Sequence, residues 1–333
     1  MRKSVVSILA SAVLTLTACA PGGSGSGDSG ASEVRIAFSN PTLFSTGLPY
    51  YVAKDQGFYK DEGLDVTATF TGGGAETVQA VVSGSADIGT ETSSPAAVGA
   101  FVSGAPIKIV SASTTGLDIV YFTTPKTGLT KTADLAGKRV GYSATGGSSH
   151  IGLLELSAML EDQGLAPIKG EVIGGPADQY TAVETGQIDA GWTQPPFFTK
   201  DLEDGKLVEV ADGAKVDKYA DVSVRVNIAN QKFLEEDPDA AKAFLRAQDR
   251  AFTWIFENPK EAVKIWQEAA DLKISEADLL LSFDYLNPEA YKVSETRGRE
   301  AILADAKKFG FVKKSISPEQ ADELFDDEYL PGS

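Results

Sequence analysis

The sequence predicts an α/β fold built as two lobes, and three observations support this expectation. The chain has 333 residues, of which 42% are apolar, so it can bury two moderate hydrophobic cores. From residue 34 onward, short β-type runs alternate with segments of helical pattern. A stretch beginning at Gly72 also repeats without gaps from Gly174, 102 positions later. The chain is therefore expected to build one structural unit twice.

The N-terminal residues 1–18 have the pattern of an export signal. Two basic residues precede an apolar stretch over residues 5–16, which is shorter than the roughly 20 apolar residues that span a bilayer. Leu16-Thr17-Ala18-Cys19 resembles the lipobox of bacterial lipoproteins, so we expect a lipid on Cys19. The alternative is an ordinary signal-peptide thiol that is lost on cleavage. Residues 19–32, rich in Gly and Ser, are predicted to be a flexible tether.

The charge and cysteine content exclude several classes of protein. A formal net charge of −17 disfavours sequence-independent binding to nucleic acid or to an anionic membrane surface. Cys19 is the only cysteine in the sequence, which excludes a disulfide scaffold and a cysteine-based metal or catalytic site. No metal or cofactor is expected.

The first half of the α/β pattern starts after the tether. Alternation of apolar and polar residues predicts strands at residues 34–39, 66–70, 86–90 and 107–111. Helical spacing of apolar residues predicts helices at residues 48–62, at residues 75–83 and from Pro95, a favourable residue for a first helical turn.

The second half repeats this order and defines the duplicated unit. Strands are predicted at residues 138–142, near residue 172 and at residues 188–192, and helices at residues 148–163 and 177–185. Both copies contain a glycine turn before the helix and an Asp-x-Gly strand end after it, namely Asp87–Gly89 and Asp189–Gly191. One fixed offset across both features argues against chance similarity.

The repeat places two stretches at the carboxyl ends of strands, where α/β sheets bind ligands. The first stretch offers hydroxyl and carboxylate groups in Thr90, Glu91, Thr92, Ser93 and Ser94. The equivalent stretch starts at Trp192 and offers an indole ring and the amide of Gln194. We expect these two stretches to face each other across a cleft.

After about residue 226 the pattern is mostly helical. Helix starts are indicated by Asp237-Pro238, by Ser275 and by Ser317. Trp254 and Trp266 lie within amphipathic helical patterns, so both are expected in the core rather than at a ligand site.

Four segments resemble the NMT1/THI5-like solute-binding proteins, which serve ABC importers of alkanesulfonates, taurine, nitrate and thiamine precursors. They are residues 48–66, 83–89, 104–110 and 134–141, within a similarity that extends from about residue 34 to residue 270. The resemblance implies a type II periplasmic-binding fold, with two lobes that close by a hinge. It also implies a monomer outside the cytoplasm, which captures a small organic solute and delivers it to membrane permease subunits.

We place lobe I at residues 33–116 and 227–333 and lobe II at residues 117–226. The two crossings between lobes are expected near residues 115–120 and 224–228. Thr115 starts the first of these, and we include it among the candidate ligand contacts.

The loop from Thr145 to His150 follows a predicted strand and opens a helix. Its candidates Gly146, Gly147, Ser148, Ser149 and His150 offer backbone N–H groups and hydroxyls for an anion or a carbonyl group. The alternative for Ser148 is a helix cap that contributes about 1 kcal/mol.

The other candidates have one ligand role and one structural alternative each. Glu91 suits a ligand amine or ring N–H, or it is an exposed carboxylate beside a helix N-terminus. Trp192 stacks on a planar ligand or packs at the hinge. Arg225 pairs with a ligand carboxylate or sulfonate, or forms an interlobe salt bridge. Phe44 and Asn40 supply an apolar wall and a hydrogen bond, or belong to a mobile loop.

An enzyme and a transcription regulator are the two alternatives to a solute-binding protein. Eukaryotic members of the family make the thiamine pyrimidine, and the resemblance implies an active-site histidine, a pyridoxal cofactor and a cysteine-rich iron motif. This sequence has one histidine, His150, and no cysteine cluster, and no nucleophile-elbow motif accompanies His150. A transcription regulator with this fold requires a DNA-binding motif where this chain has an export signal. We therefore expect a binding protein rather than an enzyme.

Overall fold

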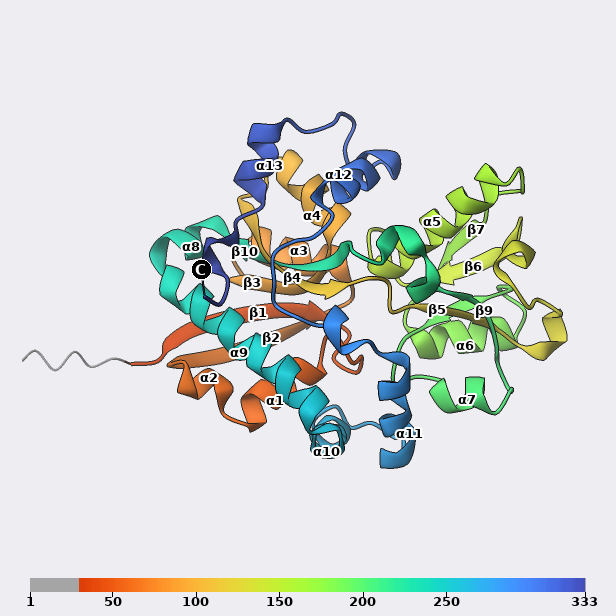
Figure 1. The fold of residues 1–333 in the computed structure, drawn as a ribbon, viewed down its shortest axis with the longest axis horizontal. Helices are drawn as coiled ribbons and strands as arrows, with labels where there is room; N and C mark the ends of the chain where they lie inside the picture. Colours follow the sequence, from red (N-terminus) through yellow and green to blue (C-terminus); the bar gives the residue numbers. More distant parts are fainter. Residues whose placement is uncertain (1–29, 333) are drawn as a thin grey trace, which may run out of the picture. The chain divides into compact units, whose positions relative to one another are not determined.

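A five-stranded sheet forms the centre of one lobe in the computed structural model, which describes residues 30–332 (Figure 1). Its strand order is β2-β1-β3-β10-β4. The strands are β1 (Ser32–Ser39), β2 (Leu64–Thr71), β3 (Ile88–Ser93), β4 (Ile107–Thr115) and β10 (Ser223–Asn230). β1 pairs in parallel with β2 and β3, whereas β10 runs antiparallel between β3 and β4. We call the part built on this sheet lobe I.

Lobe II contains the remaining strands, and their neighbour order copies that of lobe I. Three antiparallel strands have the order β8-β5-β9, and two parallel strands pair as β6-β7. They are β5 (Val120–Thr123), β6 (Arg139–Tyr142), β7 (Lys169–Val172), β8 (Gly191–Thr193) and β9 (Val208–Asp212). A parallel bridge between Val140 and Ala190 joins the two sets. The order β7-β6-β8-β5-β9 therefore matches β2-β1-β3-β10-β4, and the predicted two-lobed α/β fold is confirmed.

The helices surround both sets of strands. In lobe I they are α1 (Leu48–Asp55), α2 (Phe58–Asp61), α3 (Gly74–Val82) and α4 (Ser94–Val102). In lobe II they are α5 (Ser148–Asp162), α6 (Pro176–Glu184) and α7 (Thr199–Glu203). The C-terminal helices are α8 (Gln231–Glu236), α9 (Pro238–Glu257), α10 (Pro259–Ala269), α11 (Glu276–Leu281), α12 (Arg299–Lys308) and α13 (Pro318–Leu324).

Several predicted boundaries differ from those observed, and two of them have clear local reasons. The single helix expected over residues 48–62 is broken at Gly57, whose φ of 75° lies in the left-handed region that glycine adopts without strain. The strand expected over residues 86–90 runs instead from Ile88 to Ser93. Glu91, Thr92 and Ser93 are thus strand residues, because pairing with β10 extends the strand beyond its apolar part.

The duplicated unit predicted from the repeat is present in both lobes. Each copy runs from a strand through a glycine turn and a nine-residue helix to the next strand. Asp87 Oδ2 accepts from the backbone N of Arg35 at 2.8 Å, and Asp189 Oδ2 accepts from the backbone N of Arg139 at 2.9 Å. Both carboxylates also accept from the guanidinium of the same arginine. The repeated Asp-x-Gly pattern therefore marks a repeated clamp between adjacent strands.

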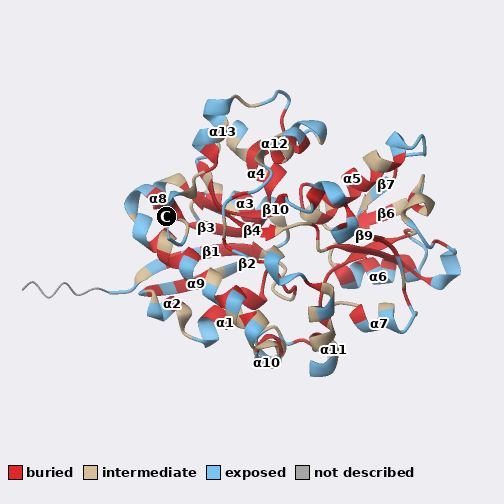
Figure 2. Cartoon of the chain, viewed as in Figure 1, coloured by how far each residue is buried: buried red, intermediate tan, exposed pale blue. Residues whose placement is uncertain are grey.

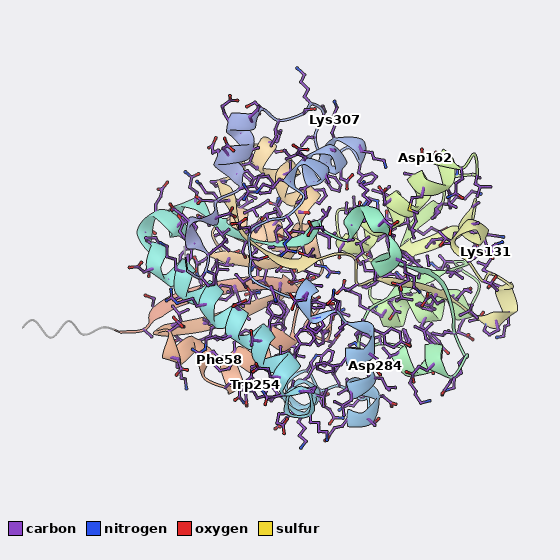
Figure 3. All side chains as sticks on the ribbon, viewed as in Figure 1. Phe58, Lys131, Asp162, Trp254, Asp284 and Lys307 are labelled. Carbon is purple, nitrogen blue, oxygen red and sulfur yellow. The ribbon has the colours of Figure 1, made fainter. Side chains whose placement is uncertain are left out.

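The C-terminal helices cover lobe I and complete its core. α9 packs against α1, α2 and β2, and Asp237 caps its first turn by accepting from the backbone N of Ala240 at 3.1 Å. Trp266 is fully buried, as expected, whereas Trp254 is half-buried at the edge of the same core (Figure 3). The central strands of both lobes are mainly buried, whereas the edge strand β7 is mostly exposed, as are many residues of the outer helices and loops (Figure 2).

Two short segments connect the lobes, residues 116–119 after β4 and residues 220–222 before β10. Residues 224–228, expected at the second crossing, lie inside β10, because their β-branched residues pair with both neighbouring strands. The division at residues 116/117 and 226/227 stays a proposal; because β10 belongs to the lobe I sheet, all of its residues, Arg225 included, are described with lobe I. The lobes also touch directly, since the backbone N of Phe44 donates to the carbonyl of Pro195 at 3.1 Å. Within residues 30–332, no helix has both the length and the apolar character to cross a membrane.

Candidate functional site

A cavity of about 340 Å³ lies between the two lobes, at the carboxyl ends of β1, β2, β3, β6 and β8. Larger hollows of about 390, 420, 510 and 590 Å³ among the described residues are lined mostly by helix surfaces and loops. The smaller cavity is the better candidate, because buried polar side chains from both lobes line it. Its lining comprises Ser39, Asn40, Pro41, Leu43, Thr46, Thr71, Gly72, Gly73, Gly74, Glu91, Ser93, Ser143, Gly147, Ser148, Ser149, Gly174, Gly175, Trp192, Gln194 and Arg225.

Three helices begin at this cavity, and a glycine precedes each first turn. Gly73 precedes α3, Gly147 precedes α5 and Gly175 precedes α6, and none of the three helices has a side-chain cap. Their first N–H groups and the positive ends of their dipoles therefore suit an electronegative group of a ligand. The expectation that Ser148 caps α5 is wrong, because Gly147 occupies the cap position.

Arg225, on β10, connects the cavity wall to lobe II and to the first crossing. Its Nε donates to Ser148 Oγ of lobe II at 3.1 Å, and its Nη2 donates to Asp118 Oδ1, in the first connecting segment, at 2.6 Å. Tyr291 donates its hydroxyl to the other oxygen of Asp118 at 2.8 Å. Burial disfavours the charge of Arg225, but Asp118 and Glu91 outweigh this effect and raise its pKa above the usual value. The guanidinium is therefore a permanent positive charge at the cavity.

Glu91 lies on β3 with its side chain almost fully buried, at 1% exposure. Its Oε2 accepts from Thr114 Oγ1 at 2.9 Å and lies 3.8 Å from Arg225 Nη1. Burial raises the pKa of Glu91 to about 7, although Arg225 and the hydroxyls of Ser113 and Thr114 favour the charged form. The expectation of an exposed carboxylate is thus wrong, because β10 and β4 cover this part of β3.

The other candidates on β3 and α4 bond within lobe I. Thr92 Oγ1 donates to the Val226 carbonyl at 2.9 Å, and Ser94 Oγ donates to the Val224 carbonyl at 3.4 Å. Both hydroxyls therefore hold β3 and α4 against β10. Thr90 is buried in β3, and Thr115 ends β4; neither lines the cavity.

Trp192 and Gln194 supply the lobe II wall of the cavity. Both side chains are buried, and the indole N–H of Trp192 donates to the Gly174 carbonyl at 3.3 Å. Asn40 lines the lobe I side, where its Oδ1 accepts from the backbone N of Thr42 at 3.1 Å. The two stretches expected to face each other thus line one cavity, through Glu91 and Ser93 on one side and Trp192 and Gln194 on the other.

Phe44 does not form a cavity wall. Its ring is 1% exposed and packs within 6 Å, centroid to centroid, of the rings of Phe256, Trp266, Phe283 and Tyr291. Aromatic rings on the C-terminal helices and the loops after them draw this side chain into the core of lobe I.

The loop before α5 divides between two environments. Ser149 Oγ accepts from the backbone N of Ser143 at 3.0 Å beside the cavity, whereas Gly146 lines the separate 510 Å³ hollow. His150 stacks on Tyr142 with ring centroids 4.4 Å apart, and its Nδ1 accepts from the backbone N of Gly146 at 3.1 Å. Burial lowers the pKa of His150, which favours the neutral ring that this hydrogen bond needs.

Comparison with known proteins identifies the family. Residues 46–262 match the model of the protein family described as NMT1/THI5 like. This chain belongs to the NMT1/THI5-like family.

Among the proteins similar to this NMT1/THI5-like chain, some are named as binding proteins and others as synthases. The taurine-binding periplasmic protein of Escherichia coli (strain K12) is 27% identical, over 84% of this chain and 86% of the relative. A 4-amino-5-hydroxymethyl-2-methylpyrimidine phosphate synthase of Candida albicans (strain WO-1) is 27% identical, over 68% of this chain and 67% of the relative. The solved structure of the periplasmic aliphatic sulphonate binding protein SsuA from Escherichia coli has a TM-score of 0.71 at 17% identity and covers 88% of this chain and 97% of that chain. The expected periplasmic-binding-protein fold is thereby confirmed.

Sequence reasoning missed several residues at the site of this NMT1/THI5-like protein. Asp118, the main partner of Arg225, lies in a connecting segment where no motif points to it. Ser143 and Leu43 line the cavity only because their loops fold toward it. Gly174 and Gly175 were part of the repeat, and their position before a helix was the signal that could have placed them in the site.

Proposed function

We propose that this chain is the extracytoplasmic solute-binding component of an ABC importer and that it holds a small organic solute in the cavity between its lobes. The observation that carries this proposal is that equivalent strand ends of both lobes, with three uncapped helix N-termini, line one cavity. A volume of about 340 Å³ is at the small end of the range typical of organic ligands. The name of the taurine-binding relative supports the same function.

In this proposal, closure of the lobes captures the solute. Phe44 and Pro195 bond across the gap through their backbones, and Arg225 bonds to Ser148 across it. A solute that contacts both lobes favours this closed arrangement over an open one, and permease subunits recognise the closed form. The residues proposed to contact the solute are those that line the cavity, with Trp192 as the apolar surface and the N-termini of α3, α5 and α6 as donors.

A pyrimidine synthase is the second candidate function, because the Candida albicans relative carries that name. The single histidine of the chain, His150, already uses Nδ1 for a hydrogen bond from Gly146. Within residues 30–332, no group of three or more His, Cys, Asp or Glu side chains is arranged to hold a metal ion. We therefore favour solute binding, and we propose that the chain works as a monomer without a cofactor.

The lipid anchor belongs to the same proposal. Cys19, the predicted export signal and residues 19–29 of the predicted tether lie outside the described residues, whereas Ser32, predicted as the last residue of the tether, is the first residue of β1. Acylation of Cys19 would hold the protein at the outer face of the cell membrane, near its permease. Metabolic labelling with a fatty acid, compared between the natural chain and Cys19→Ser, tests this part separately.

A panel of solutes tests the binding function. Alkanesulfonates, aminopyrimidines, aromatic acids and nitrate are added to the purified protein while its thermal unfolding is followed. A solute at 100 times its Kd adds about 2.7 kcal/mol of stability. We expect a sulfonated or ring-containing compound to raise the melting temperature and nitrate to leave it unchanged. A rise with nitrate alone would overturn the proposal of an organic solute.

A further inference from the structure

The charged side chains at the cavity wall do not balance. Arg225 contributes one positive charge, whereas Glu91 and Asp118, both within 4 Å of its guanidinium, contribute two negative charges when ionised. Among the described residues that line the cavity, Arg225 is the only basic one. Tyr291 donates to Asp118 but carries no charge. While Glu91 is ionised, the cluster therefore lacks one positive charge.

Three polar atoms of this wall also lack hydrogen-bond partners among the described residues. They are Glu91 Oε1, Ser93 Oγ and Arg225 Nη1, and all three are buried; Ser113 Oγ, whose hydroxyl favours the charge of Glu91, is a further buried atom without a hydrogen-bond partner. Buried polar groups are normally paired, because an unpaired one loses its hydration without compensation. One acceptor and one donor thus lack partners on neighbouring side chains, since Arg225 Nη1 lies 3.8 Å from Oε2, the other carboxylate oxygen of Glu91, without a hydrogen bond.

The position of the Glu91 side chain depends on a strained backbone conformation. β3 pairs with β10 through Gly89 and Ile228 and again through Thr92 and Val226, so two residues of β3 lie opposite one of β10. Glu91 is in this bulge with a φ of 57°, which is unusual for a residue other than glycine. Strained backbone of this kind is concentrated at functional sites, where it re-aims a side chain.

We propose that Glu91 is a specificity-determining residue that selects solutes carrying a positively charged N–H group, either an ammonium or an amidinium. The inference rests on the proposed solute-binding function and narrows the class of solute. A cationic N–H donor would form the hydrogen bond that Glu91 Oε1 lacks. It would also bring the positive charge that the cluster lacks. Such a charge-assisted bond is strong in a dehydrated site. The electronegative end of the same solute faces the uncapped helix N-termini and Arg225.

Two pairs of probes that differ mainly in this group test the inference. Acetamidinium chloride is compared with acetamide, and taurine with isethionate, in which a hydroxyl replaces the ammonium. Calorimetric titrations use the full chain, and the chloride salt is matched with NaCl. We expect the charged member of each pair to bind at least about tenfold more tightly, the contribution of one charge-assisted hydrogen bond.

Three variants distinguish a specific effect of Glu91 on solute preference from a general effect of negative charge near the cavity. Glu91→Gln keeps the shape of the side chain and should reduce the preference to less than twofold. Glu91→Asp retains the charge and should keep part of the preference. Glu76→Gln removes an exposed carboxylate near the cavity, where it accepts from the backbone N of Gly72, and should leave the preference unchanged.

The outcomes distinguish this inference from the proposed function. If Glu91→Gln discriminates as well as the natural protein, or if the uncharged probes bind equally well, the inference is wrong. A wild-type protein that binds neither charged probe also contradicts it. A panel solute without an N–H group that binds the wild-type protein and Glu91→Gln equally would leave solute binding intact while overturning the role of Glu91. Failure of every panel solute and probe would count against the proposed function itself.

Discussion

Arg225 and Ser148 form a hydrogen bond across the gap between the lobes, with Nε of Arg225 donating to Oγ of Ser148 at 3.1 Å. Arg225 lies on β10 of lobe I, and Ser148 is the first residue of α5 in lobe II. The same guanidinium binds Asp118 in the segment that connects the lobes. One side chain thus contacts the cavity, the opposite lobe and a crossing, which makes the relative position of the lobes sensitive to its surroundings.

Ser148→Ala should lower the free energy of unfolding by about 1–2 kcal/mol, because a partly buried bond to a charged donor is lost. Urea denaturation followed by fluorescence measures this change. Ser83→Ala, an exposed serine at the end of α3, is the control and should change stability by less than about 0.5 kcal/mol. Equal effects of the two substitutions would show that the Arg225–Ser148 contact contributes nothing to stability.

Arg225→Met should be far more destabilising, by about 3–5 kcal/mol, because it leaves Glu91 and Asp118 buried without their cation. The double variant Arg225→Met/Asp118→Asn should recover part of this loss, since it removes one of the stranded charges. A double-mutant cycle in urea checks the coupling. Additive losses would contradict the ion-pair account of this cluster.

The architecture was predictable because its signals are local and repeated. Glycine turns and Asp-x-Gly strand ends at a fixed offset indicated the duplicated unit, and both copies are present. Caps such as Asp237 and Ser317 marked helix starts that the structure contains. The break at Gly57 was not predicted, because a glycine within a helical pattern can adopt either a negative or a positive φ and the sequence does not indicate which.

The site was less predictable, because its contacts join residues far apart in the chain. The partners of Glu91 come from β4 and β10, and the ring of Phe44 is drawn into the core by aromatic residues more than 200 positions later. A propensity argument placed Phe44 in a loop but contained no information on those partners. Asp118 shows the same limit, since its role follows only from where β10 brings Arg225.

The paired clamps at Asp87 and Asp189 offer an internal comparison. Asp87→Asn should cost about 1–3 kcal/mol, because it weakens several bonds of a carboxylate that is 10% exposed. Asp189→Asn should cost less, since its carboxylate is 31% exposed and solvent screens the pair. Chemical denaturation of both variants checks the order, and a larger loss at Asp189 would contradict it.

Acid should remove the contribution of Asp189. The hydrogen bond from Arg139 lowers the pKa of Asp189 below its usual value. A lowered carboxyl pKa stabilises the fold above the unfolded pKa of about 3.9, and this contribution is lost as the pH falls through the folded value. The difference in stability between the natural protein and Asp189→Asn should therefore shrink between pH 6 and pH 3, as titrated by urea unfolding.

Glu91 should show the opposite dependence on pH. Burial raises its pKa to about 7, so the folded state holds this proton more tightly than the unfolded chain, and its stability falls as the pH rises from about 4.5 through 7. Glu91→Gln removes this loss. We expect the variant to match the natural protein near pH 4.5 and to exceed it by a few kcal/mol at pH 8, at about 1.4 kcal/mol per pKa unit. Both proteins keep the residues around position 91, namely Arg225, Asp118 and Tyr291. The contributions of these residues to stability therefore largely cancel when the two proteins are compared. A constant difference across this range, as expected for a substitution at the exposed Glu161, would contradict the raised pKa.

An ion-pair cluster outside the cavity connects the lobes near the second crossing. Glu155 Oε2 on α5 accepts from Lys218 Nζ at 2.9 Å and from Lys308 Nζ on α12 at 3.2 Å. Lys218 also donates to Asp305 on α12 at 2.6 Å, so the cluster joins lobe II, the segment before residues 220–222 and a C-terminal helix. Burial opposes the charge of Lys218, but Asp305 and Glu155 outweigh it and raise its pKa.

Glu155→Gln should lower the free energy of unfolding by about 1–3 kcal/mol, because the carboxylate is 8% exposed and serves two cations. Lys308→Met removes only the 45% exposed partner and should cost less than about 1 kcal/mol. Urea denaturation ranks the two variants. Since neither side chain lines the cavity, a change in solute affinity in Glu155→Gln would report a shift between open and closed lobes rather than a lost contact with the solute. Equal costs for the two substitutions would show that the buried half of this cluster does not hold the lobes together.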